Sequence, residues 1–218
     1  MTRSFDATDD YVLLGSGFSS GEALTVSAWV YSLATTTANR YVFCHDPATS
    51  NIGHYALSVS SVFNFRMRGT VLSSLTTIST GAWINIAGVG VQNGGSRVYL
   101  NGVLDNSTAT DNALSGTSVQ TIIGAQTTGG TAVWNGYIAH LQIFRGRTLS
   151  VNEINQIMRY PGSITRSLEY FPLLGANPEV GWFANSGTGL VVGSTVVSDG
   201  PPINGISNVP KPELIHVF

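Results

Sequence analysis

Apolar and polar residues alternate with a period of two along most of this chain. The segment LTVSAWVYS (24–32) shows the pattern best, because its alternate side chains form one aliphatic face and one aromatic, half-polar face. Successive side chains of a β-strand point to opposite faces, so this alternation predicts strands. The same pattern marks RYVFCH (40–45), HYALSVS (54–60), VFNFRMR (62–68), AWINIAGVGV (82–91), SRVYLNGVL (96–104), VQTIIGA (119–125) and GYIAHLQIF (136–144).

Turn segments such as Asn93-Gly94-Gly95 separate these strands. Glycine adopts the positive φ angles that tight turns require. Many short strands joined by such turns predict an all-β fold, an antiparallel β-sandwich or jelly roll.

One short helix is predicted after the last of these strands. Ser150 has the position of an N-cap and Glu153 follows three residues later, which is the spacing of a capping box. Leu149 and Ile154 have the spacing of a hydrophobic staple, and Pro161 ends the helical pattern. The face predicted to dock on a sheet consists of Val151, Ile154, Ile157 and Met158.

The chain changes character after this helix. Residues 1–163 hold the alternating strands and the helix, and we expect them to form the jelly roll. Residues 164–197 contain two more strand-like pieces, SLEYFPLL (167–174) and GLVVGSTVV (189–197), which we expect to pack on the same sandwich. Residues 198–218 are rich in proline and glycine and have no periodic pattern, so they predict an extended C-terminal arm.

Charge and cysteine content narrow the function classes. Charged residues make up 10% of the chain, against about 25% in an average globular protein, and the formal net charge is −2. Neither nucleic acid nor an anionic membrane is therefore expected as a partner. The single cysteine, Cys44, excludes an intramolecular disulfide. No secretory signal and no apolar run of about 20 residues is present, so we expect synthesis in a cytoplasm.

Four segments resemble LamG-like (laminin G / concanavalin A-like) jelly-roll domains, and they occur in the order that this family has. They are SFDATDDYVLL (4–14), GEALTVSAWVYS (21–32), GAWINIAGVGVQNGGSRVYLNGVLDNST (81–108) and WNGYIAHLQIFRGRTLSVNEINQI (134–157). The resemblance covers roughly residues 4–160 and implies a concanavalin A-like β-sandwich. It also implies that residues 134–157 are the last strand of the jelly roll and its capped helix.

Two departures from the family pattern bear on function. Ala139 stands where the family often has an acidic residue that serves calcium binding, so we expect no metal and no other cofactor. The segment 169–196 looks like one that usually precedes these domains, although here it follows them. Combinations of this kind, with a Pro-Pro ending, resemble structural proteins of tailed bacteriophages.

No catalytic apparatus is predicted. A glycoside hydrolase needs two carboxylates that flank the scissile bond, and the five glutamates of this chain are far apart in the sequence. Cys44 and His45 point to opposite faces of a strand and cannot form a dyad, so we expect a core cysteine beside an exposed histidine.

Two kinds of residue remain as candidate ligand contacts. Asp9 and Asp10, with Asp6 nearby, are the best candidates for a cation, although a plain turn before the strand explains them as well. Trp134 and Trp182 are candidates for stacking on sugars, because Trp29 and Trp83 occupy positions that are usually in the core of this family.

Three functions follow, in order of preference. The leading hypothesis is a non-enzymatic structural or interaction protein on the surface of a bacteriophage virion, made in the host cytoplasm. Its partners would be other virion proteins or further copies of itself, for example in a trimer. The alternative is a lectin module that binds glycans for adhesion, and the third is a glycoside hydrolase. The residues expected to make assembly contacts are Leu214, Ile215, Val217 and Phe218.

Overall fold

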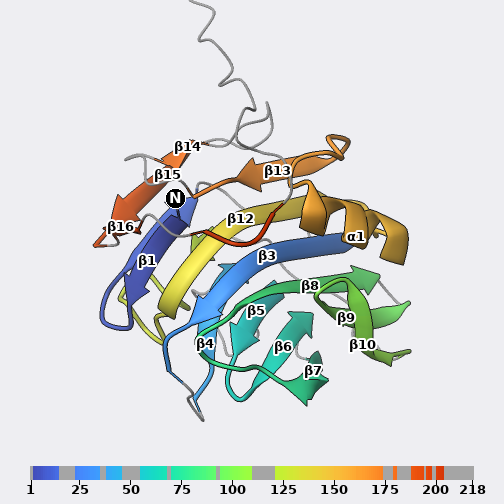
Figure 1. Ribbon diagram of the computed structural model, residues 1–218, viewed down its shortest axis with the longest axis horizontal. Coiled ribbons are helices and arrows are strands. Elements are labelled where there is room, and N and C mark those ends of the chain that lie inside the picture. The colour runs from blue at the N-terminus through green and yellow to red at the C-terminus, as the bar shows by residue number, and fades with distance from the viewer. Residues whose placement is uncertain are drawn as a thin grey trace, which may run out of the picture.

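The computed structural model describes residues 2–14, 23–34, 38–45, 55–67, 70–91, 94–109, 121–173, 179–180, 188–193, 195–197 and 200–203. These residues form two antiparallel sheets that pack into a sandwich (Figure 1). The first sheet contains β1 (Thr2–Asp6), β3 (Leu24–Ser32), β8 (Trp83–Val91), β9 (Gly95–Leu100), β10 (Val103–Thr108), β12 (Asn135–Arg145), β13 (Leu168–Phe171) and β16 (Thr195–Val197). The second contains β2 (Tyr11–Leu14), β4 (Arg40–His45), β5 (Tyr55–Val59), β6 (Val62–Met67), β7 (Thr70–Thr77), β11 (Thr121–Ile123), β14 (Glu179–Val180) and β15 (Thr188–Val192).

The strand order shows how segments far apart in the sequence meet. In the first sheet the order is β10-β9-β8-β3-β12-β1-β16, and β13 also pairs with β12. In the second sheet it is β14-β15-β2-β11-β4-β5-β6-β7. The all-β sandwich predicted from the alternation is confirmed.

Several strand boundaries agree with the alternating pattern, and some do not. The segments 24–32 and 40–45 form strands with those bounds. The segment 96–104, expected as one strand, is broken at Asn101 and Gly102, which both have positive φ angles (48° and 77°) and turn the chain from β9 into β10. The alternating pattern does not mark β7 and β10 as separate strands, because their exposed positions weaken it.

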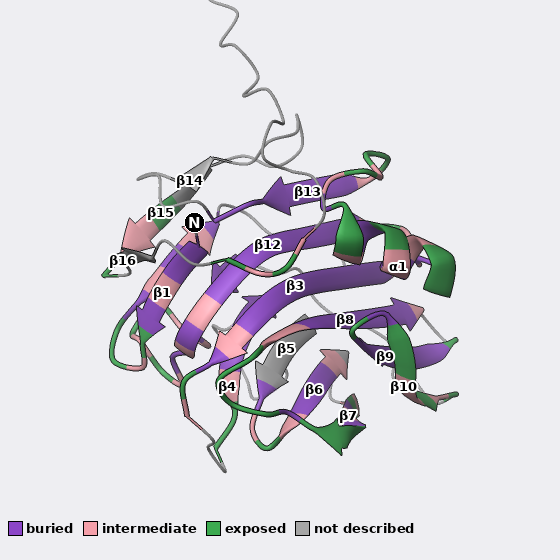
Figure 2. Cartoon of the chain, viewed as in Figure 1, coloured by how far each residue is buried: buried purple, intermediate pink, exposed green. Residues whose placement is uncertain are grey.

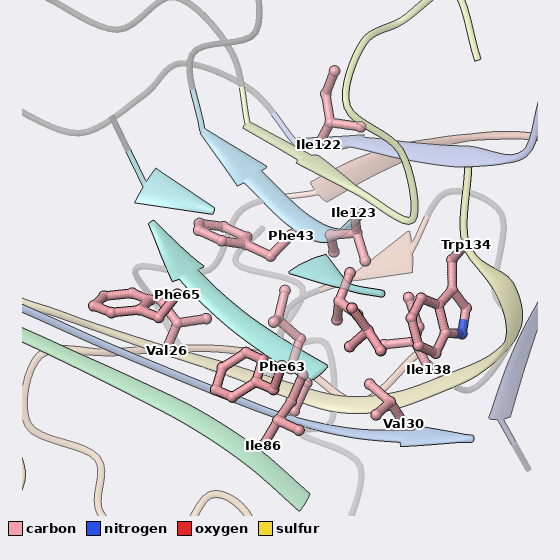
Figure 3. Close-up of a cluster of buried hydrophobic side chains, with 14 of the residues drawn as sticks. Val26, Val30, Phe43, Phe63, Phe65, Ile86, Ile122, Ile123, Trp134 and Ile138 are labelled. Atoms are coloured by element: carbon pink, nitrogen blue, oxygen red, sulfur yellow. The ribbon is translucent and has the colours of Figure 1, made fainter. Parts of the chain in front are cut away.

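The main core lies between the sheets. Figure 3 shows phenylalanines of the second sheet, such as Phe43 and Phe63, facing aliphatic side chains of the first, such as Val30 and Ile86. The ring of Phe65 fits only because residue 88 is a glycine: a Cβ on Gly88 would come within 2.2 Å of the ring. Burial of this apolar surface is the main driving force for sheet packing.

β12 carries a β-bulge at His140. Its pairing with β3 shifts between Ala139 and Gln142, and His140 has a φ angle of 52°. A bulge exchanges the two faces of a strand, so Ile138 before it and Leu141 after it both enter the main core. The bulge also divides one edge of β12, which pairs with β1 up to Ile138 and with β13 from Leu141.

The helix α1 (Val151–Arg159) covers part of the outer face of the first sheet (Figure 1). Ile154 and Ile157 are buried there in a second apolar cluster, and the indole of Trp29 donates to the carbonyl of Met158 at 3.1 Å. The expected apolar face is correct for these isoleucines but wrong for Val151, which is exposed. Val151 is the first helical residue, and Met158, the fourth member of the expected face, is partly buried.

The capping box predicted at the start of α1 is confirmed. The amide of Glu153 donates to Oγ of Ser150 at 3.4 Å, and the amide of Ser150 donates to the carboxylate of Glu153 at 2.8 Å. Leu149 is buried in the same cluster as Ile154, as a hydrophobic staple requires.

Removing this cap should destabilise the protein modestly. Replacing Ser150 by Ala leaves one amide of the first turn without its side-chain partner, so we expect a loss of about 1 kcal/mol in the free energy of unfolding. Urea unfolding measures it, and Ser150→Asp, which restores an N-cap acceptor, is the matched control. A loss as large in Ser150→Asp as in Ser150→Ala would show that the cap is not responsible.

The strands after the helix contribute to both sheets. β13 pairs with β12, β16 pairs with β1, and β15 pairs with β2. Of the predicted C-terminal arm, the structure describes residues 200–203, where the amide of Ile203 donates to the carbonyl of Pro201. Among the described residues, no helix has the length and hydrophobicity needed to cross a membrane.

Candidate functional site

Three aromatic rings gather on the outer face of the first sheet. Tyr31, Trp83 and Tyr137 belong to the adjacent strands β3, β8 and β12, and Tyr31 is directly paired with each of the other two. Their neighbours in sequence, such as Val30 and Ile138, point into the main core, so the rings point outward. Figure 2 shows half-buried segments at the ends of these strands that lie beyond α1. We call these three residues the aromatic triangle.

The rings converge and do not form a flat row. Strands β8 and β12 lie on either side of β3, so their backbones are about 9–10 Å apart. The ring centroids of Trp83 and Tyr137 are nevertheless only 6.3 Å apart, and those of Tyr31 lie 5.7 Å from Trp83 and 5.2 Å from Tyr137. The ring planes differ by 31° to 64°. The three rings therefore form one compact aromatic cluster on this face of the sheet.

An acidic loop borders this surface. Asp6 ends β1 and pairs with Asn135, which lies two residues before Tyr137 on β12 and therefore on the same face of the sheet. Carboxylate oxygens of Asp6, Asp9 and Asp10 all lie within 4.8 Å of one another. We call these three residues the acidic loop.

Hydrogen bonds within the acidic loop explain its shape. Oδ2 of Asp10 accepts from the amide of Asp6, and Oδ1 of Asp6 accepts from the amide of Thr8, both at 2.8 Å. Burial of Asp10 raises the pKa of its carboxyl group; the backbone hydrogen bond from Asp6 opposes this, and the charges of Asp6 and Asp9 add to it. The turn that the sequence suggested is therefore present.

The same loop offers oxygen ligands of the kind that calcium prefers. Three carboxylates fall short of the six to eight oxygens of a calcium site, and two of their oxygens already accept backbone hydrogen bonds. The absence of a metal stays a prediction.

The roles expected for two tryptophans are reversed. Trp134, a candidate for sugar stacking, is only 1% exposed and belongs to the main core, so its ring cannot stack on a ligand. Trp83, expected in the core, is half-buried at the surface of the aromatic triangle. The sequence contains a signal for this, because Trp83 shares the parity of the polar Asn85 and opposes that of Ile84 and Ile86.

His45 also differs from expectation. Its side chain is buried, as is that of Cys44, and its Nδ1 lies 2.8 Å from Oγ1 of Thr121. Cys44 is buried as expected, but in a small cluster with Tyr41 and not in the main core. The expected exposed histidine is wrong, because His45 lies on the same face of β4 as Phe43, which points into the main core.

The remaining candidate residues are one tryptophan and four residues near the C-terminus. Trp182 lies outside the described residues, and so do the expected assembly contacts Leu214, Ile215, Val217 and Phe218.

Comparison with known families is consistent with this geometry. Residues 6–155 match a family model described as the concanavalin A-like lectin/glucanases superfamily. The chain belongs to this superfamily. A search of curated proteins by sequence finds no match.

Solved structures share the fold at low sequence identity. A protein of Bacteroides ovatus assigned to carbohydrate binding superimposes with a TM-score of 0.70 and 15% identity over 94% of this chain and 62% of that protein. The heptameric SAP-like pentraxin of Limulus polyphemus gives a TM-score of 0.63 and 16% identity over 88% and 92% of the two chains. Domain 4 of an extracellular arabinanase of Geobacillus stearothermophilus gives 0.52 and 21% identity over 67% and 71%.

Proposed function

We propose that this chain is a non-catalytic carbohydrate-binding module and that the aromatic triangle is its binding surface. The observation that carries the proposal is the convergence of three half-buried rings on a part of the sheet beyond the helix. Aromatic faces carry negative partial charge and attract the C–H groups of a sugar ring, while the phenolic and indole groups bond to its hydroxyls. The low charge of the chain also suits a neutral ligand.

Similar structures support this class of function. The Bacteroides ovatus protein is assigned to carbohydrate binding, and the arabinanase domain 4 was solved in complex with arabinotriose. The chain spans 62% of the length of the Bacteroides protein. The fold is thus one that other proteins use for sugar recognition.

The compact triangle favours recognition of a single sugar unit, such as a chain end or a branch. Ring planes that differ by up to 64° cannot lie flat against an extended or crystalline polysaccharide. Affinity should therefore rise little with oligosaccharide length beyond one or two units.

Replacing Trp83 by Ala should weaken glycan binding strongly. Loss of one stacked ring costs about 1–3 kcal/mol where ligands stack on aromatic side chains, which is roughly fivefold to more than a hundredfold in Kd. A glycan array identifies a ligand, and isothermal titration calorimetry then compares the wild type with the variant.

The control is Leu190→Ala, which removes an exposed apolar side chain from β15 in the other sheet. Unchanged binding by Trp83→Ala would place the site elsewhere. Release of reducing ends from the same glycans would show that the protein hydrolyses them and is not a binding module alone.

The virion hypothesis stays a prediction, and one observation favours an assembly role as a second candidate. Leu75 on β7 and Val103 on β10 are 76% and 68% exposed, and these edge strands contact one another. Exposed apolar side chains on a sheet edge are typical of contacts between subunits. Analytical ultracentrifugation of the wild type and of a Leu75→Ser, Val103→Ser variant tests for self-association through this edge.

A further inference from the structure

We infer that the acidic loop makes the aromatic triangle selective for uncharged glycans over glycans that carry carboxylates, such as uronic or sialic acids. This inference rests on the proposed function and adds the ligand class. It follows from where the loop lies, from its charge and from the groups around it.

The start of the loop, at Asp6, lies next to the triangle on the same face of the sheet. Ser4 pairs with Tyr137, and Asp6 lies two residues farther along β1, opposite Asn135. With strands about 4.8 Å apart and a rise of about 3.4 Å per residue, the Cα atoms of Asp6 and Tyr137 are roughly 8 Å apart. This is about one Debye length at physiological ionic strength, so the loop's field reaches a sugar held on the triangle.

The loop concentrates negative charge at one place on the surface. Asp6 and Asp9 are exposed, and their carboxylates crowd together with that of Asp10. The ion pairs of Arg145 with Glu169 and of Arg147 with Glu153 do not include this loop.

A sugar carboxylate on the triangle would therefore meet at least two like charges. At 8–10 Å and with an effective dielectric constant between that of water and about half that value, the unscreened repulsion would weaken binding roughly five- to twentyfold. Screening at physiological ionic strength reduces this to roughly two- to threefold. An uncharged sugar of the same shape would not meet this repulsion.

The test compares matched pairs of oligosaccharides, each a neutral hexose oligomer and its uronic-acid counterpart. Titrations with the intact chain use chelator-treated buffer, so that no divalent cation neutralises the loop. At physiological ionic strength the wild type should bind the neutral member roughly two- to threefold more tightly than the anionic one. Lowering the salt to about 0.01 M should enlarge this difference, and about 0.5 M salt should remove most of it.

Two variants connect the discrimination to the loop. Asp6→Asn with Asp9→Asn removes two charges and keeps oxygen acceptors for the turn, so affinity for the anionic member should rise while that for the neutral member stays the same. Asp9→Glu keeps the charge and should keep the discrimination.

The outcomes separate the two proposals. Equal binding of both members by the wild type, or unchanged discrimination in the double variant, would overturn the charge selection and leave glycan binding intact. No binding to any neutral member would overturn the proposed function itself.

Discussion

Replacing Trp134 by Ala should lower the free energy of unfolding by about 3–5 kcal/mol, as expected when a large buried side chain leaves a cavity. Trp134 is only 1% exposed and lies beside Ile138 in the core (Figure 3). Its backbone is also integrated, because its amide donates to the carbonyl of Gly124 at 2.7 Å and its carbonyl accepts from Ala7 at 3.0 Å. Chemical unfolding measures the loss. Thermal unfolding should show a decrease in Tm of about 2–4 °C per kcal/mol for a chain of this size.

Two variants make this result specific. Trp134→Phe keeps most of the ring and removes an indole N–H that has no hydrogen-bond partner among the described residues, so its cost should stay below about 1.5 kcal/mol. Trp83→Ala should also cost little stability, because its ring is half-buried. A loss for Trp83→Ala as large as that for Trp134→Ala would contradict the assignment of one ring to the surface and the other to the core.

The second large effect concerns pH. Burial lowers the pKa of His140 to about 4, and its Nδ1 lies 2.6 Å from the hydroxyl group of Tyr170. In the unfolded chain the ring has a pKa of about 6.5. Between these two pKa values the unfolded state binds a proton and the folded state does not. Stability therefore falls as pH decreases from about 6.5 to about 4. The contribution at pH 4.5 is a loss of roughly 2.5 kcal/mol relative to pH 7.5.

Comparison with His140→Asn isolates this contribution. Asparagine tolerates the positive φ angle of this bulge and does not titrate, whereas the carboxyl groups, including Glu169, whose pKa is raised by burial, remain the same in both proteins. Urea unfolding at pH 7.5 and pH 4.5 should show a smaller loss in the variant by roughly 2.5 kcal/mol. The same loss in both proteins would mean that His140 is not the group responsible.

The positions of two tryptophans, Trp83 and Trp134, explain how far the site could be predicted. Trp83 and Tyr31 are visible in the sequence as aromatic residues on the polar face of their strands. Their proximity to Tyr137 could not be predicted from the sequence, because it depends on β3 lying between β8 and β12. Those two strands are separated by more than 40 residues. Trp134 precedes β12 in an irregular segment, where no periodicity says which way a side chain points.

The sequence by itself determined the features that depend on neighbours within a few residues. Alternation identified the strands 24–32 and 40–45, and Ser150 with Glu153 identified the start of the helix, because side-chain direction and capping are local properties. Only the tertiary structure decided the strand order, the bulge at His140 that exchanges the faces of β12, and the face that α1 leaves open. Each of these depends on contacts between distant segments, and burial on both faces of a sheet hides them from any local pattern.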